Sequence, residues 1–445
     1  MRYLTFVFCT LIPVSVTAQT PASPVVLTLE EAIAQGIANS QRLAELQSRL
    51  EAADFAIAGR QAADMPTIAA YGGYTRTNHV QEFVIVAPGL PPQVVYPDIP
   101  DNYRTRLDLQ WPIYTGGRTD ALERAARAER FAVTQDVAAA RADLRLEITR
   151  AYWAAVTAGE TEAVLRRSQA AVDAHVSDVR ARLAEGLVPP NEVATAEAQA
   201  SRQRLFAIEA ANQRQIAEAD LRRLTANEAP ALRLTGDTSK SGDSRVPAQI
   251  TLTTNVPELA AGARTLRPER VALEQRAVAA DHRAAAVAAA GKPQIAVGGG
   301  YDYARPNPRI FPRSGDWMSS WDASVNVTWT LWDGGRRAAE HGEALANAAA
   351  LKARVAEFDR QVTFEVRARF FELESSRQAI LAADDEIRAA TEAERVVGER
   401  YKAGVVTSTD VLDAQVARLQ AELDRTRAVA AVRLAEARLE RALGR

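Results

Sequence analysis

The chain has almost no cysteine, which limits its possible chemistry. The one cysteine, Cys9, lies within residues 1–18, MRYLTFVFCTLIPVSVTA, where an arginine precedes a short apolar run and a small-residue end. That pattern predicts a secretory signal peptide, cleaved before Gln19. We expect no lipid anchor at Cys9, because Phe8 rather than a small residue precedes it. The exported chain would then contain no cysteine, and we expect neither disulfide bonds nor thiol chemistry.

Long hydrophobic runs and basic clusters are also missing. No apolar run reaches the roughly 18 residues of a membrane-spanning helix, so a membrane protein with this sequence would have to be a β-barrel. The formal net charge is -2, which together with the lack of a basic patch argues against a nucleic-acid partner. The four histidines have no metal-ligand spacing, and no nucleophile constellation or phosphate loop is present. We therefore expect no enzyme, no cofactor and no metal site.

The stretch from Tyr103 to Arg118, YRTRLDLQWPIYTGGR, alternates apolar and polar residues. This period of two predicts a β-strand with one apolar face and one polar face. Its length of about eleven residues, its terminal aromatics and its Gly-Gly end are typical of a transmembrane strand with a wet inner face, although a soluble half-buried strand shows the same alternation. A lipid-facing girdle would contain Tyr103 and Trp111, and the lumen would be lined by Arg104, Arg106 and Asp108.

The same pattern recurs 218 positions later as WDASVNVTWTLWDGGR, from Trp321 to Arg336. Here Trp321 and Trp329 occupy the girdle positions, and Asp322 and Asn326 occupy the lumen positions. The same shift carries the segment IAEADLRRL onto LAEARLERA. We therefore interpret the chain as an internal duplication.

The duplication predicts the order of elements. Repeat 1 covers residues 19–227, with a helix capped by Thr28 that runs to about Ala63, a strand hairpin over 67–115, a long helix over 118–185 and a helix over 191–224. The prolines of residues 77–102 indicate an exposed loop within the hairpin. A linker over 228–266 precedes repeat 2, residues 267–445, with a helix, a hairpin over 294–333, a long helix over 336–403 and a helix over 408–444.

The long helices are too long for an ordinary globular domain. At 1.5 Å per residue, each would measure on the order of 100 Å. A coiled-coil seam filled largely with small residues is indicated by the spacing of Leu144, Ile148, Ala151, Ala155 and Ala158. Such a seam lets helices approach closely, as a tube of helices requires.

Counting strands indicates an oligomer. Two hairpins give four strands per chain, whereas the smallest bacterial barrels need about eight. One chain therefore cannot close a barrel alone. Three copies would give twelve strands and a water-filled lumen, and two copies would also give an even number, so counting leaves the copy number open.

Several stretches resemble the TolC-type outer-membrane efflux family: LTLEEAIAQGIANS, WPIYTGGR, WTLWDGGR, GLVPPNEVATAEAQ and YKAGVVTSTDVLDAQ. The resemblance covers nearly the whole mature chain. It implies an α+β membrane protein, in which a trimeric 12-stranded β-barrel in the outer membrane is continued by a long α-helical barrel across the periplasm. The implied function is that of a passive exit duct of a tripartite efflux or type I secretion system. Its partners would be a periplasmic adaptor protein, an inner-membrane transporter and outer-membrane lipid; the substrate is not indicated.

The resemblance also implies a gate at the periplasmic end. Asp410 and Asp413 lie three residues apart on one face at the start of the last helix, where carboxylates also complement the helix dipole. In the family, the matching aspartates ring the periplasmic aperture, and such a ring favours cations. The family's closing latch uses an acid, a tyrosine and an arginine: Glu192 and Tyr401 match the first two, but the arginine position is Val406. We therefore expect the closed state to rest on a Glu192–Tyr401 hydrogen bond and on helix packing.

Two other classes of protein share some of these features. A periplasmic coiled-coil scaffold or adaptor protein would have similar long helices, but it would lack the duplicated strands bounded by aromatic residues. An enzyme that used Asp410 and Asp413 as acid and base would need a third catalytic group, which the sequence does not offer.

Overall fold

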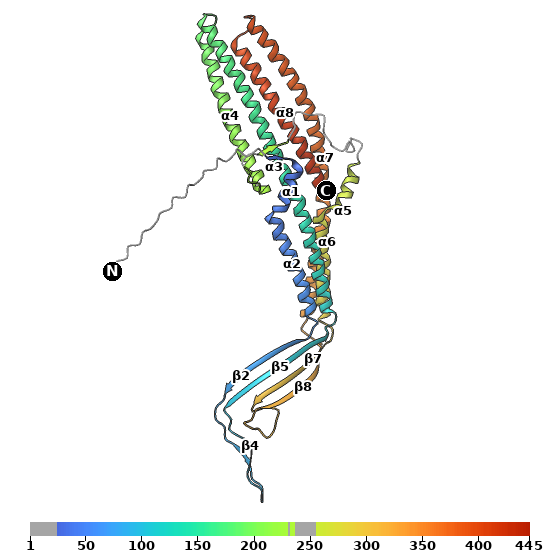
Figure 1. Ribbon diagram of the computed structural model, residues 1–445. Coiled ribbons are helices and arrows are strands. Elements are labelled where there is room, and N and C mark those ends of the chain that lie inside the picture. Colours follow the sequence, from blue (N-terminus) through green and yellow to red (C-terminus); the bar gives the residue numbers. More distant parts are fainter. Residues whose placement is uncertain (1–24, 230–231, 236–254) are drawn as a thin grey trace, which may run out of the picture. The chain divides into compact units, whose positions relative to one another are not determined.

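The computed structural model describes residues 25–229, 232–235 and 255–445 (Figure 1). The expected signal peptide and Cys9 lie outside these residues. The chain divides into two compact units: the first contains residues up to Ser40, Leu144–Ile250 and Phe371–Arg438, and the second contains Gln41–Asp143, Thr251–Phe370 and Leu439–Arg445. Among the described helices, none has both the length and the apolar character that crossing a membrane requires.

The second unit contains a four-stranded antiparallel sheet. Its strands are β2 (Thr67–Arg76), β5 (Asp101–Tyr114), β7 (Gln294–Arg305) and β8 (Met318–Thr328), in the order β2-β5-β7-β8. The register pairs Tyr74 with Tyr103 and Tyr301 with Trp321, which places the apolar positions of the strands on one face. The alternation predicted for β5 is therefore present. β8 begins three residues before Trp321, where the predicted pattern starts, and it ends at Thr328, so Trp329 follows the strand.

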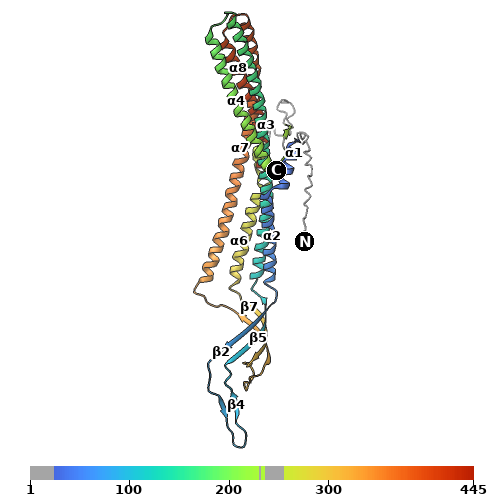
Figure 2. The same cartoon turned by 60° about the vertical axis from the view of Figure 1, so that its left-hand side comes forward.

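The stretch predicted as an exposed loop over 77–102 contains a further hairpin. It consists of β3 (Phe83–Ile85) and β4 (Gln93–Tyr96), and it extends past the end of the sheet (Figures 1 and 2). Asp98 links the two sides of this hairpin at its base. The Asp98 carboxylate contacts His79 Nδ1 at 2.6 Å and accepts a hydrogen bond from the amide of Val80 at 3.1 Å. The prediction gave too much weight to the prolines and too little to the β-formers between them.

The long helices occupy the predicted ranges. α3 spans Arg118–Ala184 and α7 spans Arg336–Lys402, each with 67 residues. Turns containing Gly186 and Gly404 join them to α4 (Pro190–Thr225) and α8 (Ser408–Ala442). Both glycines have positive φ, 74° and 73°, a conformation that glycine adopts without strain.

The single first helix predicted from Thr28 to about Ala63 is wrong, because it is two helices. α1 (Leu29–Asn39) and α2 (Gln41–Ala62) are separated by Ser40, whose backbone is extended. The second half repeats this break: α5 (Val256–Leu266) and α6 (Pro268–Ala289) are separated by Arg267, which is also extended. All four helix bounds shift by 227 positions, so α5, which lies inside the predicted linker, is the counterpart of α1.

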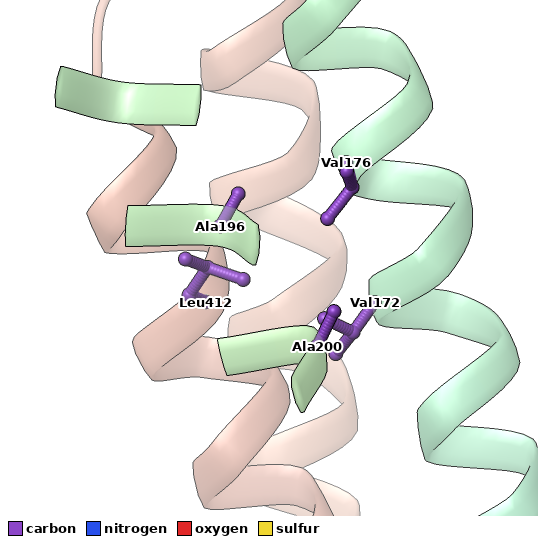
Figure 3. Close-up of a cluster of buried hydrophobic side chains, with 5 residues drawn as sticks. All are labelled: Val172, Val176, Ala196, Ala200 and Leu412. Atoms are coloured by element: carbon purple, nitrogen blue, oxygen red, sulfur yellow. The ribbon is translucent and has the colours of Figure 1, made fainter. Parts of the chain in front are cut away.

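Small strands and small side chains complete the first unit. β1 (Val25–Leu27) pairs in parallel with β6 (Leu232–Leu234), and the Tyr152 hydroxyl donates to the carbonyl oxygen of Leu27 at 3.0 Å. The predicted seam of α3 is buried except for the half-buried Ala158. Farther along, a buried cluster joins α3, α4 and α8 and consists of Val172, Val176, Ala196, Ala200 and Leu412 (Figure 3).

Candidate functional site

The end of α3, the end of α7 and the start of α8 meet in the first unit around two aromatic rings. The buried Tyr401, near the end of α7, lies with its ring centroid 5.4 Å from that of His175 on α3. The guanidinium carbon of Arg182 lies 4.4 Å from the centroid of the Tyr401 ring. His175 Nε2 is 2.8 Å from the hydroxyl of Ser408, the first residue of α8, and both side chains are buried. We call His175, Arg182, Tyr401 and Ser408 the tip cluster.

The Glu192–Tyr401 hydrogen bond expected from the sequence is not made in this structure. The Tyr401 hydroxyl and Glu192 Oε2 are both buried, and neither has a hydrogen-bond partner within the described part of the chain. Burial raises the pKa of Tyr401, and the nearby Arg182 cation opposes that rise. Instead, Tyr401 contacts His175 and Arg182 through its ring and not through its hydroxyl.

Sequence reasoning missed His175 and Arg182. His175 lies three residues after Val172 and four before Val179, a spacing that places it on the packed face of the helix. This spacing could have identified His175 as a buried residue from the sequence. The partners of His175 on α7 and α8 could not have been predicted, because they depend on how separate helices pack.

The two predicted aperture residues are exposed at the start of α8. Asp410 accepts hydrogen bonds from the Thr407 amide at 2.8 Å and from the Thr407 hydroxyl at 2.7 Å, and its own amide donates to that hydroxyl at 3.4 Å. This capping arrangement lowers the pKa of Asp410. Asp410 therefore caps the helix and still presents an ionised carboxylate to solvent.

Asp413 lies at one end of a groove of about 990 Å³ whose walls are formed by α3, α4 and α8. The groove contains apolar residues such as Leu412 and Phe206. It also contains Gln203, a buried side chain whose Oε1 has no hydrogen-bond partner among the described residues.

In the second unit, the predicted lumen residues gather on the polar face of the sheet. Arg106 is the centre of this group: its Nη1 lies 2.6 Å from Asp302 and 3.0 Å from Asp322, and its Nη2 lies 2.9 Å from Asp108. Arg104 Nε also binds Asp302, at 2.6 Å.

The fifth predicted lumen residue, Asn326, donates to the hydroxyl of Ser324 at 3.2 Å. Asp302, the most buried carboxylate of the group, was not predicted, although its position between Tyr301 and Tyr303 follows the same alternation as the neighbouring strands.

The four predicted girdle residues are exposed on the other face or at its margin. Tyr103 contacts Tyr74 and Trp317, with ring centroids 5.0 Å and 5.9 Å away. Trp111 Nε1 donates to the carbonyl oxygen of Asp64, and Trp329 Nε1 donates to that of Gly291, each at 3.1 Å. Both acceptors lie two residues before a proline, so the two halves hold these tryptophans in the same way. Trp321, the fourth, is exposed on β8.

Within residues 25–229, 232–235 and 255–445, no group of three or more histidine, cysteine, aspartate or glutamate side chains is placed to hold a metal ion.

Solved structures share this fold. A membrane protein from Pseudomonas aeruginosa is 22% identical, with a TM-score of 0.77, and the match covers 94% of this chain and 92% of that one. The outer membrane protein VceC from Vibrio cholerae is 18% identical, with a TM-score of 0.74 and coverage of 94% and 96%. The MtrE outer membrane channel of Neisseria gonorrhoeae, solved in its open state, is 21% identical, with a TM-score of 0.75 and coverage of 94% and 88%.

Sequence comparison is more specific than these distant structural matches. No curated protein matches the chain significantly. The family model described as outer membrane efflux protein matches residues 32–227 and 259–445, which together make up most of the sequence. The chain therefore belongs to the outer membrane efflux protein family.

Proposed function

We propose that the chain is one of three identical subunits of a passive exit duct in the outer membrane. Three four-stranded sheets would join edge to edge into a twelve-stranded β-barrel. The long helices would continue this barrel as an α-helical tube across the periplasm. Substrate would pass through the duct from an inner-membrane transporter, with a periplasmic adaptor joining the two.

The observation that carries this proposal is the character of the four-stranded sheet. One face exposes large apolar side chains, including Tyr301, Trp321, Val325 and Val327. The other face carries the ion-paired group around Arg106. Within the described residues, β2 and β8 each have one edge without a partner strand, and unpaired backbone groups cannot remain exposed to lipid. An apolar outer face, a charged inner face and two open edges fit a segment of a barrel that copies of the chain complete.

The repeated arrangement of elements supports the same proposal. The four described helices of each half, α1–α4 and α5–α8, occur in the same order around the strands. The tryptophan before each Gly-Gly turn donates its indole N–H to a backbone carbonyl oxygen at the matching position. This is the arrangement expected if one hairpin and its supporting helices were duplicated. Each copy of the chain would then supply two similar hairpins to the barrel.

The gate would lie at the helix tips. Repetition around a threefold axis would bring three copies of Asp410 and Asp413 to one constriction, where the carboxylates would attract cations and repel anions. The adaptor and transporter would dock on the exposed turns over residues 186–191 and 404–409 and separate the tips. Asp413 also lines the α3-α4-α8 groove, so a movement of α8 would change both the groove and the constriction.

Location and orientation can be tested with two single-cysteine variants of similar exposure. Leu90, between β3 and β4, is 69% exposed, and Leu187, in the turn between α3 and α4, is 67% exposed. In intact cells, a membrane-impermeant maleimide should label Leu90→Cys but not Leu187→Cys, and it should label both once the outer membrane is permeabilised. Labelling of Leu187→Cys in intact cells, with Leu90→Cys protected, would contradict the proposed orientation.

The copy number needs a separate measurement. The mass of the protein part of the detergent-extracted complex should be three times that of the mature chain. A mass of two chains would contradict the trimer and indicate a dimer. A monomer that stays in solution without detergent would favour the periplasmic scaffold instead.

A further inference from the structure

We infer that His175 and Arg182 of α3 hold the helix tips shut through their contacts with Tyr401 and Ser408, and that protonation of His175 releases them. This inference rests on the proposed duct and concerns the regulation of its gate. It assigns the latch to the tip cluster.

The first step is the position of His175. Its imidazole contacts Tyr401 near the end of α7 and Ser408 at the start of α8, the two ends of one tight turn. A single buried side chain on α3 therefore fixes both helices of the α7-α8 pair. The contact to Ser408 is buried on both sides, so breaking it without replacement would leave polar groups unsatisfied.

The second step is the position of Arg182. It lies seven residues after His175, which places both on the same face of α3. Its guanidinium lies over the Tyr401 ring, 4.4 Å from the centroid, and its Nε contacts Asp178 at 3.1 Å. A cation over an aromatic face is attractive. Arg182 thus adds a second contact from α3 to the end of α7.

The third step is charge. Burial lowers the pKa of His175, so the ring is neutral in the shut tip at neutral pH. The carboxylates of Asp178 and Glu192 oppose that shift, and the Arg182 cation adds to it. The titratable and charged groups that face the ring are Asp178 and Arg182 on α3, Glu192 on α4 and Tyr401 on α7; Ser408 on α8 is the neutral partner.

The direction of the pH effect follows from linkage. If the tips separate, His175 becomes exposed and its pKa returns to the ordinary value of about 6.5. The separated state then binds a proton more readily than the shut state, so the shut state loses stability as the pH falls through about 6.5. Acid should therefore open the gate.

The first experiment measures the open fraction of single channels in a planar bilayer between pH 7.5 and pH 5.5. The wild-type open fraction should rise by roughly fivefold or more, a change that one or two kcal/mol produces. His175→Asn, which does not titrate but can still hydrogen-bond to Ser408, should show no such rise. The control His341→Asn, which removes a histidine near the start of α7 and outside the tip cluster, should keep it. An unchanged pH profile in His175→Asn would overturn the inference.

A second pair of variants tests Arg182. Arg182→Met keeps much of the side-chain volume and removes the cation, so the open fraction at pH 7.5 should rise by about fivefold. Arg182→Lys should restore part of the wild-type behaviour, since an ammonium also binds an aromatic face. Equal open fractions for wild type and Arg182→Met would remove Arg182 from the latch.

Hydrogen exchange separates this inference from the proposed duct. In detergent, amides of residues 401–410 should lose protection below about pH 6.5 in the wild type, after correction for intrinsic exchange rates, but not in His175→Asn. If the wild type formed no channel, the proposed duct would fail, and this exchange result would still decide whether His175 releases the tips. Identical protection in both proteins at both pH values would overturn the release.

Discussion

At the residue scale, glycine at position 300 makes room for the ion pairs on the inner face of the sheet. A Cβ on Gly300 would collide with the guanidinium of Arg106, which three carboxylates hold in place. On the opposite face, a Cβ on Gly299 would make only ordinary contacts, the nearest at 3.6 Å. The two neighbouring glycines therefore form a matched pair for substitution.

We predict that Gly300→Ala lowers stability by roughly 1–3 kcal/mol, as overpacking does, whereas Gly299→Ala has a much smaller effect. The measurement is the thermal unfolding midpoint of the detergent-extracted protein. Equal midpoints for the two variants would show that Arg106 moves aside without loss and that the ion-paired group is not rigid.

Tyr401 gives a second prediction at this scale. Tyr401→Phe removes a hydroxyl that has no hydrogen-bond partner among the described residues and keeps the ring that contacts His175 and Arg182. The open fraction should therefore match that of the wild type. Tyr401→Ala removes the ring and leaves a cavity, so the open fraction should rise by at least roughly tenfold. Single-channel recording at pH 7.5 distinguishes the two, and a large rise in Tyr401→Phe would restore the Glu192–Tyr401 bond as the latch.

Residue identity and alternation were sufficient to predict which side chains share a face. Arg104, Arg106 and Asp108 were placed correctly because a strand repeats every two residues. Asp302 and His175 were missed because their roles depend on partners nearly 200 or more positions away in the sequence. Local patterns contain no information about such partners unless a repeat or a resemblance supplies it.

At the element scale, the turn between α7 and α8 depends on the backbone of Gly404. Its φ is 73°, and a Cβ there would meet no neighbouring atom, so the cost of a side chain is purely conformational. Gly398, inside α7, also has open space around it but lacks a positive φ.

We predict opposite effects for the two alanine substitutions. Gly404→Ala should destabilise the turn by roughly 1–2 kcal/mol, the cost of a left-handed residue, and Gly398→Ala should stabilise the helix by up to about 1 kcal/mol. Hydrogen exchange at the α7-α8 turn and within α7 would measure both. Loss of protection in Gly398→Ala, or none in Gly404→Ala, would contradict this account of the turn.

Element lengths were predicted well where breakers are absent and poorly where a break has no strong sequence signal. The two 67-residue helices follow from long stretches without proline. The breaks at Ser40 and Arg267 involve only one extended residue each. α5 was placed in a linker because its flanking residues contain several prolines and glycines, although Pro257 and Pro268 occupy first-turn positions where proline is favourable.

At the scale of the whole molecule, the chain is a transport protein of the outer membrane efflux family and not an enzyme. The family was evident from the sequence because the strand exits and helix turns recur in both halves. The copy number was not, because a single chain shows open sheet edges but not how many copies close them. Docking involves surfaces of other molecules, which the sequence of one chain does not specify.

The central claim is that copies of this chain form a conducting duct with a carboxylate-lined aperture. Single-channel recording of the purified protein in a planar lipid bilayer tests it most directly, with the reversal potential measured across a salt gradient. We predict discrete openings with a preference for cations, and loss of that preference in Asp410→Asn/Asp413→Asn, in which asparagine preserves the size of each side chain. A folded oligomer that never conducts would contradict the duct, and unchanged selectivity in the double variant would contradict the aperture.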